Sequence, residues 1–186
     1  MRKKYQGMTV NERLYKSNLI DEFDSAVNKK DIAAIVSILE KVELTEKSIV
    51  SILESLRLYE EIYEYKRKNF INNTQKYFKF LEAEFKFNKS NHLFSKQPNG
   101  TVISDKIEYE NTFRKIIISN SYHPVDYGFE INVIDKEKGT NEMLCFVLKE
   151  KQDLKQEYLK EQVEVLKNYC RNDKIGFDRN SCGNLW

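Results

Sequence analysis

The sequence predicts an α+β fold in which helices come first and an antiparallel sheet follows. Apolar residues recur at helical spacing up to about residue 88. From about residue 91 onward, apolar and polar residues alternate with a period of two, which is typical of strands. A last helical pattern begins at Asp153. We therefore expect a three-helix module over residues 8–57, linking helices, a four-stranded and mainly antiparallel sheet, and a C-terminal helix.

Helix-capping residues support the three-helix module. Thr9 and Glu12 have the spacing of a capping box, in which a hydroxyl and a carboxylate bind each other's backbone amides. Asp31 and Thr45 are placed to cap the next two helices. Ser17-Asn18 lies inside the first apolar stripe, at a point where that helix can divide into two. A module of roughly 50 residues is near the lower limit for independent stability, so we expect it to pack on another surface, with a homodimer as one arrangement.

A linking helix is expected over residues 58–72 and an α+β domain over residues 73–170, with Asn72-Asn73 as the break between them. The stretch 58–88 is rich in aromatic residues, most of which recur at helical spacing and are expected in the core. Because tyrosine and arginine are frequent interface anchors, a candidate protein-binding surface consists of Tyr59, Tyr63, Tyr65 and Arg67. Nucleic acid, which stacks on aromatic rings beside basic groups, ranks below protein as a partner, since glutamates share this segment.

Four strands are expected, over residues 102–109, 113–118, 127–133 and 143–148. Asn111-Thr112 joins the first two closely and residues 136–139 join the last two, which predicts an antiparallel meander. Three consecutive isoleucines, Ile116 to Ile118, predict a central strand that is covered on both faces. Residues 171–186 are polar and are expected to form a tail.

Composition limits the classes of partner. The chain has 31 basic and 29 acidic residues and a net charge of +2, which is too small to hold nucleic acid or an anionic membrane nonspecifically. No apolar run approaches the roughly 18 residues of a membrane-spanning helix, and no apolar segment follows the basic start, so no membrane association is expected. Three cysteines without a CxxC pair indicate a reducing compartment, and we expect the protein in the cytoplasm.

No metal site and no cofactor are expected from the residues. His92 and His123 are far apart in the sequence, and neither has a second ligand at the spacing of a zinc site. No glycine-rich turn precedes a helix in the arrangement that cradles phosphate. Cys145 lies in an apolar strand, where burial raises the pKa of a thiol and makes it a poor nucleophile. A disulfide between Cys170 and Cys182 is geometrically allowed.

A divalent-metal nuclease is the enzyme class that the sequence leaves open, because such a site needs only carboxylates and a lysine on a sheet. Its candidate catalytic residues are Asp105, Asp126 and Glu130. However, Asn132 stands two residues after Glu130, where such a site usually places lysine. Acids that alternate with apolar residues are also found on any solvent-facing strand, so catalysis ranks below binding.

Two parts of the chain resemble known bacterial families. The first comprises Met8-Thr-Val-Asn-Glu-Arg-Leu-Tyr, Leu19-Ile-Asp-Glu-Phe-Asp, Ala26-Val, Lys30-Asp and Ile38-Leu-Glu-Lys-Val-Glu-Leu-Thr. It resembles a short helical family of unknown function. The second comprises Tyr77-Phe-Lys-Phe-Leu-Glu-Ala-Glu-Phe-Lys-Phe, Ile107-Glu-Tyr-Glu-Asn and Ile116-Ile-Ile. It resembles small α+β proteins grouped with immunity proteins, which usually carry glycine where this chain has Lys86. That resemblance implies neutralisation of a toxin by binding it, and it supplies no catalytic residues.

The sequence therefore favours a non-catalytic, cytoplasmic protein-binding protein of immunity or toxin-neutralising type. Its expected partner is another protein, either a toxin or a component of a defence system. Two alternatives stay open. One is the divalent-metal nuclease, and the other is a mobile-element protein that blocks a host defence complex.

Overall fold

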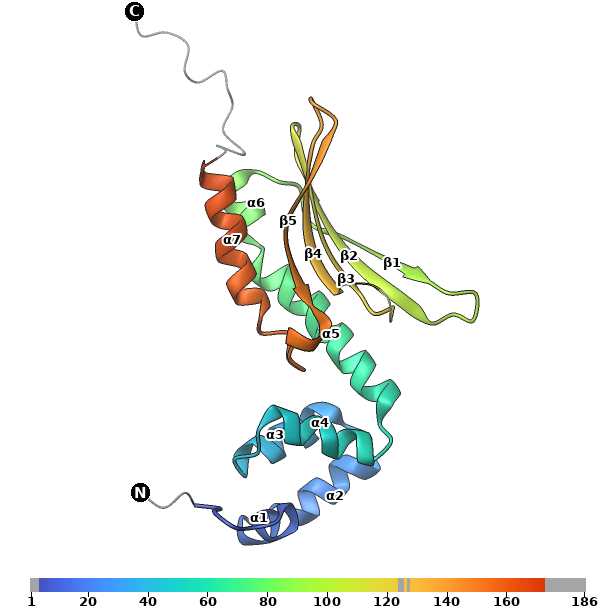
Figure 1. Ribbon diagram of the computed structural model, residues 1–186, viewed down its shortest axis with the longest axis vertical. Coiled ribbons are helices and arrows are strands. Elements are labelled where there is room, and N and C mark those ends of the chain that lie inside the picture. Colours follow the sequence, from blue (N-terminus) through green and yellow to red (C-terminus); the bar gives the residue numbers. More distant parts are fainter. Residues whose placement is uncertain (1–3, 124–125, 127, 173–186) are drawn as a thin grey trace, which may run out of the picture. The chain divides into compact units, whose positions relative to one another are not determined.

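The predicted order of elements, helices followed by a sheet and a last helix, is confirmed in a computed structural model of the chain (Figure 1). The structure describes residues 4–123, 126 and 128–172. The fold is α+β, and it divides between Lys68 and Asn69 into two compact units, here called the helical unit and the sheet unit. Most of the expected polar tail, residues 173–186, lies outside the described residues.

In its described residues, the helical unit has four short helices before the long helix α5, and not three. These are α1 (Val10–Lys16), α2 (Ile20–Asn28), α3 (Ile32–Lys41) and α4 (Glu46–Ser55). The first expected helix divides at Ser17-Asn18. The expected caps are present: Thr9 and Glu12 form the capping box, and the side chains of Asp31 and Thr45 accept hydrogen bonds from backbone amides three residues later. Each cap fixes where a helix begins.

These four helices all end on a left-handed residue that is not glycine. The residues are Asn18, Lys30, Glu43 and Arg57, with φ between 52° and 59°. The amide that follows each of them bonds to the carbonyl five residues before it, as from Leu19 to Leu14 and from Leu44 to Leu39. This is the Schellman type of helix end, and a leucine follows the left-handed residue at Asn18, Glu43 and Arg57. The helices are therefore kept short by local backbone bonding, with no glycine or proline at their ends.

Helix α5 (Tyr59–Tyr77) runs without interruption through Asn72-Asn73, where the sequence indicates a break. It contains no glycine or proline to end it. The Asn73 side chain does not cap a helix but donates to the backbone carbonyl of Lys155 at 2.7 Å, on the segment that precedes the last helix. Helix α6 (Phe80–Phe85) follows and ends at Lys86, which is left-handed with φ 56°. None of the described helices is long and apolar enough to cross a bilayer.

The sheet is a five-stranded antiparallel meander, and not the expected four strands. The expected strands correspond to β2 (Val102–Glu110), β3 (Arg114–Ser121), β4 (Gly128–Asp135) and β5 (Thr140–Leu148), after which comes a short 3-10 turn, η1 (Lys149–Lys151). The additional strand β1 (Asn91–Lys96) forms one edge and pairs with β2. Because nearly all its side chains are exposed, the alternation that marks a half-buried strand is absent.

Helices α6 and α7 (Leu159–Asn172) and the part of α5 that belongs to the sheet unit lie on one face of the sheet, here called the inner face (Figure 1). The core sits between them and includes Phe70, Phe78, Leu81, Ile107, Ile116, Ile118, Phe129, Ile131, Leu159 and Leu166. Strand β3 is central, as expected. It is covered by helices on the inner face only, because the opposite face, here called the outer face, is free of described helices of the sheet unit. Ile117, which points to the outer face, is half-buried.

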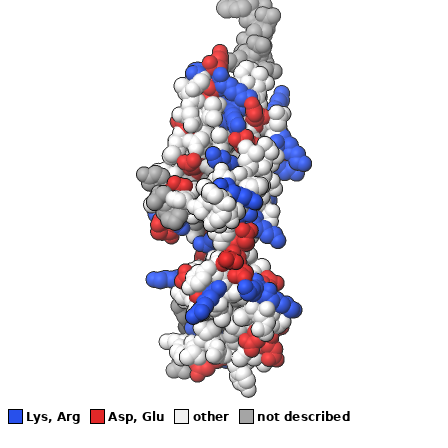
Figure 2. Space-filling view, turned by 90° about the vertical axis from the view of Figure 1, so that its right-hand side faces the viewer, with Lys and Arg blue, Asp and Glu red and all other residues white. Residues whose placement is uncertain are grey.

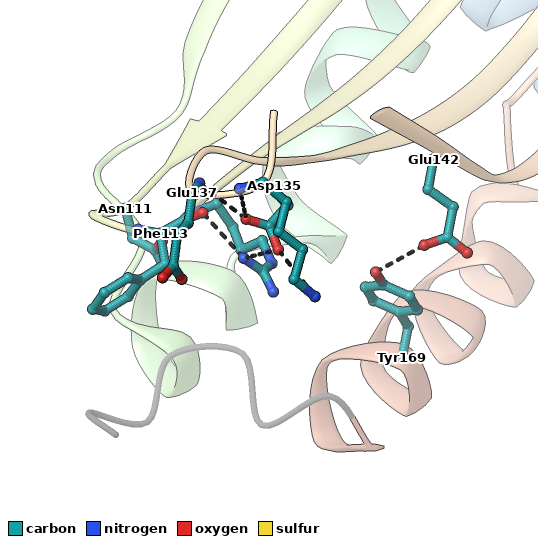
Figure 3. A network of polar contacts seen from close by, with 8 residues as sticks. Asn111, Phe113, Asp135, Glu137, Glu142 and Tyr169 are labelled. Carbon is teal, nitrogen blue, oxygen red and sulfur yellow. Dashed lines mark hydrogen bonds and ion pairs between the residues drawn. The ribbon is translucent and has the colours of Figure 1, made fainter. Parts of the chain in front are cut away.

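Two turns at one end of the sheet are joined by a polar network (Figure 3). Oδ1 of Asn111 accepts a hydrogen bond from the amide of Arg114. The Arg114 guanidinium lies 2.7 Å from Oδ2 of Asp135. The Asp135 carboxylate also accepts hydrogen bonds from the amides of Glu137 and Lys138. These bonds tie the turn after β2 to the turn after β4 and so help to set the register of the strands.

The C-terminal helix α7 begins at Leu159, later than the Asp153 start that the sequence indicates. The Asp153 carboxylate instead accepts hydrogen bonds from the amides of Glu157 and Tyr158, and so it caps the turn that leads into the helix. Near the end of α7, the hydroxyl of Tyr169 donates to a glutamate of β5 (Figure 3). Asp153 thus fixes where the helix begins, and Tyr169 ties its end to β5.

Candidate functional site

The outer face of the sheet carries a polar hollow of about 340 Å³. It is lined by Ser104, Lys106, Ser119, Ser121, Asp126, Gly128 and Glu130. The antiparallel register explains how three strands contribute to it, because Lys106 of β2 pairs with Ser119 of β3, and Ser119 pairs with Glu130 of β4. Since side chains alternate between the faces of a strand, these three project from the outer face in one row.

Serine hydroxyls hold the two acidic side chains of the hollow. Ser119 donates to Oε1 of Glu130 at 3.2 Å, and Ser121 donates to Oδ2 of Asp126. Asp126 lies in the turn after β3, where its amide donates to the carbonyl of His123. This turn returns the Asp126 carboxylate to the end of β3. Both acids are therefore positioned by neutral hydroxyl groups, which add no positive charge beside the carboxylates.

The two acids of the hollow have no cationic partner, in contrast to four other acids of the sheet. Within the described residues, no basic nitrogen lies within 4.0 Å of the Asp126 or Glu130 carboxylate, and the Lys106 ammonium has no acidic partner at that distance. Four other acids of the sheet are paired: Asp105 with His92, Glu108 with Lys115, Glu110 with Lys136, and Asp135 with Arg114. Glu142 accepts a hydrogen bond from Tyr169. The hollow thus presents two unpaired negative charges and one unpaired positive charge.

Gly128 contributes only backbone to the hollow. Its φ is +111°, a conformation that other residues rarely adopt. A Cβ atom at this position would lie 2.6 Å from Nε2 of Gln152 and 3.0 Å from the carbonyl oxygen of Val147. The Gln152 amide is itself held by hydrogen bonds to Asn120 and Val147. Both the backbone conformation and the available space therefore require glycine here.

Large apolar side chains stand beside the polar row on the outer face. Phe146 of β5 lies directly opposite Glu130, and Leu93 of β1 lies directly opposite Lys106. Phe146 is 56% exposed and Leu93 is 43% exposed, while Met143, also on β5, is 53% exposed. A sheet face that meets only water normally carries polar residues at such positions. The outer face therefore combines a polar centre with apolar side chains on both edge strands.

Charge is mixed on the side of the molecule that Figure 2 shows. Lysine and arginine side chains lie among aspartate and glutamate side chains, without an extended region of one sign. The net charge of the whole chain is only +2. This surface offers no continuous basic track to a phosphate backbone.

The structure separates the three acids that the sequence suggests as metal ligands. Asp126 and Glu130 share the hollow, but Asp105 lies on the inner face, where its carboxylate is fully buried and Oδ1 lies 2.7 Å from Nε2 of His92. Within the described residues, no three His, Cys, Asp or Glu side chains are grouped so that they could hold a metal ion. Asp105 is therefore not part of a common site with the other two acids.

The candidate binding residues of α5 do not form one patch. Tyr59, Tyr63 and Arg67 are spaced by four and lie along one side of the helix, whereas Tyr65 lies on another side. Tyr59 is 61% exposed, and the other three are half-buried. The Arg67 guanidinium lies 3.4 Å from the Glu64 carboxylate. Within this group, Tyr59 presents the most accessible aromatic surface.

Sequence reasoning missed Lys106 and the serines that complete the hollow. The alternation of β2 puts Lys106 on the outer face, but which residues it meets depends on the register with β3 and β4.

The Cys145 thiol has a raised pKa, as the sequence indicates. Burial raises the pKa of this half-buried thiol to about 11, so that little thiolate forms at neutral pH. Cys170 is buried, and Cys182 lies outside the described residues.

No family model matches the chain, and neither a curated protein nor a solved structure matches it. The chemistry of the hollow is therefore the guide to its use. Two carboxylates are held in place without neutralisation, one ammonium is unpaired, and apolar side chains flank the row at both ends. Such a set is suited to bind a cationic group and to surround it with apolar contact.

Proposed function

We propose that the chain is a non-catalytic, cytoplasmic protein-binding protein of immunity or toxin-neutralising type, which binds its partner with the outer face of the sheet. The observation that carries this proposal is the exposure of Leu93, Met143 and Phe146 on a face that no described helix of the sheet unit covers. Full burial of such a side chain contributes roughly 1.5–3 kcal/mol, and about half of that remains available here because each is about half exposed. A partner that covers them therefore gains a driving force, and the protein acts by blocking the surface it binds.

The make-up of the outer face favours protein over nucleic acid as the partner. Protein interfaces combine apolar anchors with polar and charged neighbours, and exposed apolar groups rimmed by polar residues mark interaction sites. Here Phe146 and Leu93 flank the row Lys106–Ser119–Glu130. The interspersed charges in Figure 2 support the same choice, because nucleic acid requires an excess of basic groups.

The test uses the full chain, co-expressed with each protein encoded by a neighbouring gene. Complex formation is measured by co-elution and by titration calorimetry, and neutralisation by the rescue of growth. Phe146→Ser and Leu93→Ser are expected to weaken the complex by about tenfold each, because truncation of an interface anchor that costs about 1.4 kcal/mol lowers affinity tenfold. Val165→Ser is the matched control, since Val165 is similarly exposed but lies on α7, in the layer on the inner face.

Two results would count against the proposal. One is that no neighbouring product forms a complex with the chain. The other is a complex whose affinity is the same for the wild type, Phe146→Ser and Leu93→Ser. A mobile-element protein that blocks a defence complex would use the same face, and the identity of the partner recovered would distinguish it from an immunity protein. Self-association through the helical unit stays a prediction, and light scattering that finds a monomer would contradict it.

A divalent-metal nuclease is the second candidate, and one observation favours it. Asp126, Glu130 and Lys106 line the same hollow, so Lys106 supplies the lysine that the sequence lacks at Asn132. Two carboxylates can hold Mg²⁺ when a substrate phosphate completes its coordination. Incubation of the protein with DNA and RNA in Mg²⁺ or Mn²⁺ tests this. Cleavage that Glu130→Ala abolishes would support the nuclease, and cleavage that survives this change would exclude Glu130 from it.

A further inference from the structure

We infer that the hollow receives an arginine side chain of the protein partner, with the guanidinium between Asp126 and Glu130 and beside Phe146. The inference rests on the proposed function and adds the chemistry that the partner must present. Its first support is that the receptor is built in advance. Ser121 and Ser119 each donate one hydrogen bond to these acids, and a carboxylate has about four acceptor positions. Acceptors for a cation therefore remain, on side chains that are already ordered.

The second support is a missing positive charge. Four other carboxylates of the sheet pair with basic side chains of the chain, as Glu108 pairs with Lys115 at 2.9 Å on the same outer face. Lys106 belongs to the same row as Glu130, but Ser119 stands between them and no ion pair forms. The two carboxylates and the single Lys106 ammonium leave the lining of the hollow with a net negative charge, which attracts a cation from outside.

The neighbouring aromatic ring favours arginine over lysine. Phe146 lies directly opposite Glu130 across the β4–β5 pair, and Cβ atoms of opposite residues are about 4.5–5.5 Å apart. A planar guanidinium can bind a carboxylate with two parallel hydrogen bonds and stack on an aromatic face at the same time. A lysine ammonium is a point charge and gains less from this arrangement.

A divalent metal ion fits the same place less well. The hollow offers two carboxylates, and no third His, Cys, Asp or Glu joins them within the described residues. The Lys106 ammonium lines the hollow as well and repels a doubly charged ion more than a singly charged one. The same ammonium can accept a carboxylate or carbonyl oxygen next to the arginine. The partner is therefore expected to present an arginine with an acidic residue close to it.

The test is an NMR titration of the intact ¹⁵N-labelled chain with N-acetyl-arginine methylamide. We expect saturable shifts in the amide signals of Ser119, Ser121, Glu130 and Phe146, and none with the uncharged citrulline analogue. Glu130→Gln and Asp126→Asn are each expected to weaken binding by about tenfold, in line with the loss of a charge-assisted hydrogen bond. Glu108→Gln is the matched control, because this acid on the same face is already paired with Lys115, and it should leave the affinity unchanged. The dispersion of the amide signals shows whether each variant is folded. Because Asp126 is exposed, the Asp126→Asn variant still tests the inference if Glu130→Gln does not fold.

Three results would overturn the inference: no shifts at these amides, equal shifts with citrulline, or binding that neither acid affects. Displacement of the arginine compound by millimolar Mg²⁺ or Ca²⁺ would assign the hollow to a metal instead. The experiments distinguish failure of this inference from failure of the proposed function. If the arginine receptor fails while Phe146→Ser still weakens the partner complex, only the receptor is lost. If arginine binds but the partner complex ignores Phe146 and Leu93, the outer-face function fails, and the assignment of the arginine to the partner fails with it.

Discussion

Nε2 of His92 lies 2.7 Å from Oδ1 of Asp105, and the Asp105 side chain is fully buried while that of His92 is 26% exposed. The two residues come from β1 and β2 and meet on the inner face. A buried carboxylate is strongly unfavourable unless it is paired or hydrogen-bonded. The pair therefore fastens the edge strand β1 to the sheet. It also accounts for Asp105, which the sequence suggests as a nuclease residue, as a partner of His92 apart from Asp126 and Glu130.

His92→Ala is expected to lower the free energy of unfolding by about 3 kcal/mol, because it takes away a partner of a buried acid. Urea denaturation followed by circular dichroism measures the change. His123→Ala is the control, since the hydrogen bonds described for His123 are made by its backbone. A loss at His92 that is no greater than the loss at His123 would show that the pair does not stabilise the sheet.

Gly128→Ala is expected to destabilise the fold by about 2–3 kcal/mol, because strain from the backbone and crowding against Gln152 and Val147 both oppose a side chain. Gly139→Ala separates the two effects. Gly139 also has a positive φ, +65°, but nothing lies within 4 Å of an added Cβ, so a loss of about 1 kcal/mol is expected there. Thermal unfolding of both variants gives the comparison. Equal losses would mean that the surroundings of Gly128 can make room without cost.

The parts of the fold that the sequence predicts are those set by neighbouring residues. The caps Thr9, Asp31 and Thr45 and the four expected strands depend on patterns over a few positions, and all are present. Strand β1 is different, because it is held by pairing with β2 and by the His92–Asp105 contact, neither of which leaves an apolar alternation in the sequence. The left-handed helix ends were equally hidden, since residues such as Lys30 are not those that usually adopt this conformation.

The candidate site shows where prediction from the sequence stops. Asp105 is in phase with Ile107 along β2, so the strand pattern alone places it on the buried face, away from Glu130. That Lys106 shares a hollow with Glu130 depends on the register of three strands. The pairing of Glu130 with Phe146 depends further on a register shift in the β4–β5 pairing between Ile131 and Asn132, which the sequence does not predict. Side-chain chemistry could be listed from the sequence, but the neighbours of each side chain could not.

Asp135→Asn is expected to make the free energy of unfolding depend less on pH in the acid range. The backbone amide of Lys138, followed by the Arg114 guanidinium, holds the pKa of Asp135 below its ordinary value. A lowered folded-state pKa stabilises the protein above the unfolded-state pKa of about 3.9, and this contribution disappears as the pH falls through the folded-state value. The wild type should therefore exceed the variant in stability at neutral pH and approach it in strong acid. Urea denaturation between pH 2 and 7 measures this, and parallel profiles would contradict it.

Lys86→Gly is expected to stabilise the sheet unit. Lys86 ends α6 with φ 56°, and the amide of Phe87 bonds back to the Leu81 carbonyl across this turn. A left-handed residue with a side chain costs about 1–2 kcal/mol, which exceeds the roughly 0.5–1 kcal/mol that glycine loses through the greater freedom of the unfolded chain. The free energy of unfolding should rise by about 0.5 kcal/mol on this balance. The same substitution at Lys68, an exposed position inside α5, should lower it by about 1 kcal/mol. Chemical denaturation of the two variants measures both changes, and a loss at Lys86 as large as that at Lys68 would show that contacts of the Lys86 side chain outweigh the strain of its backbone.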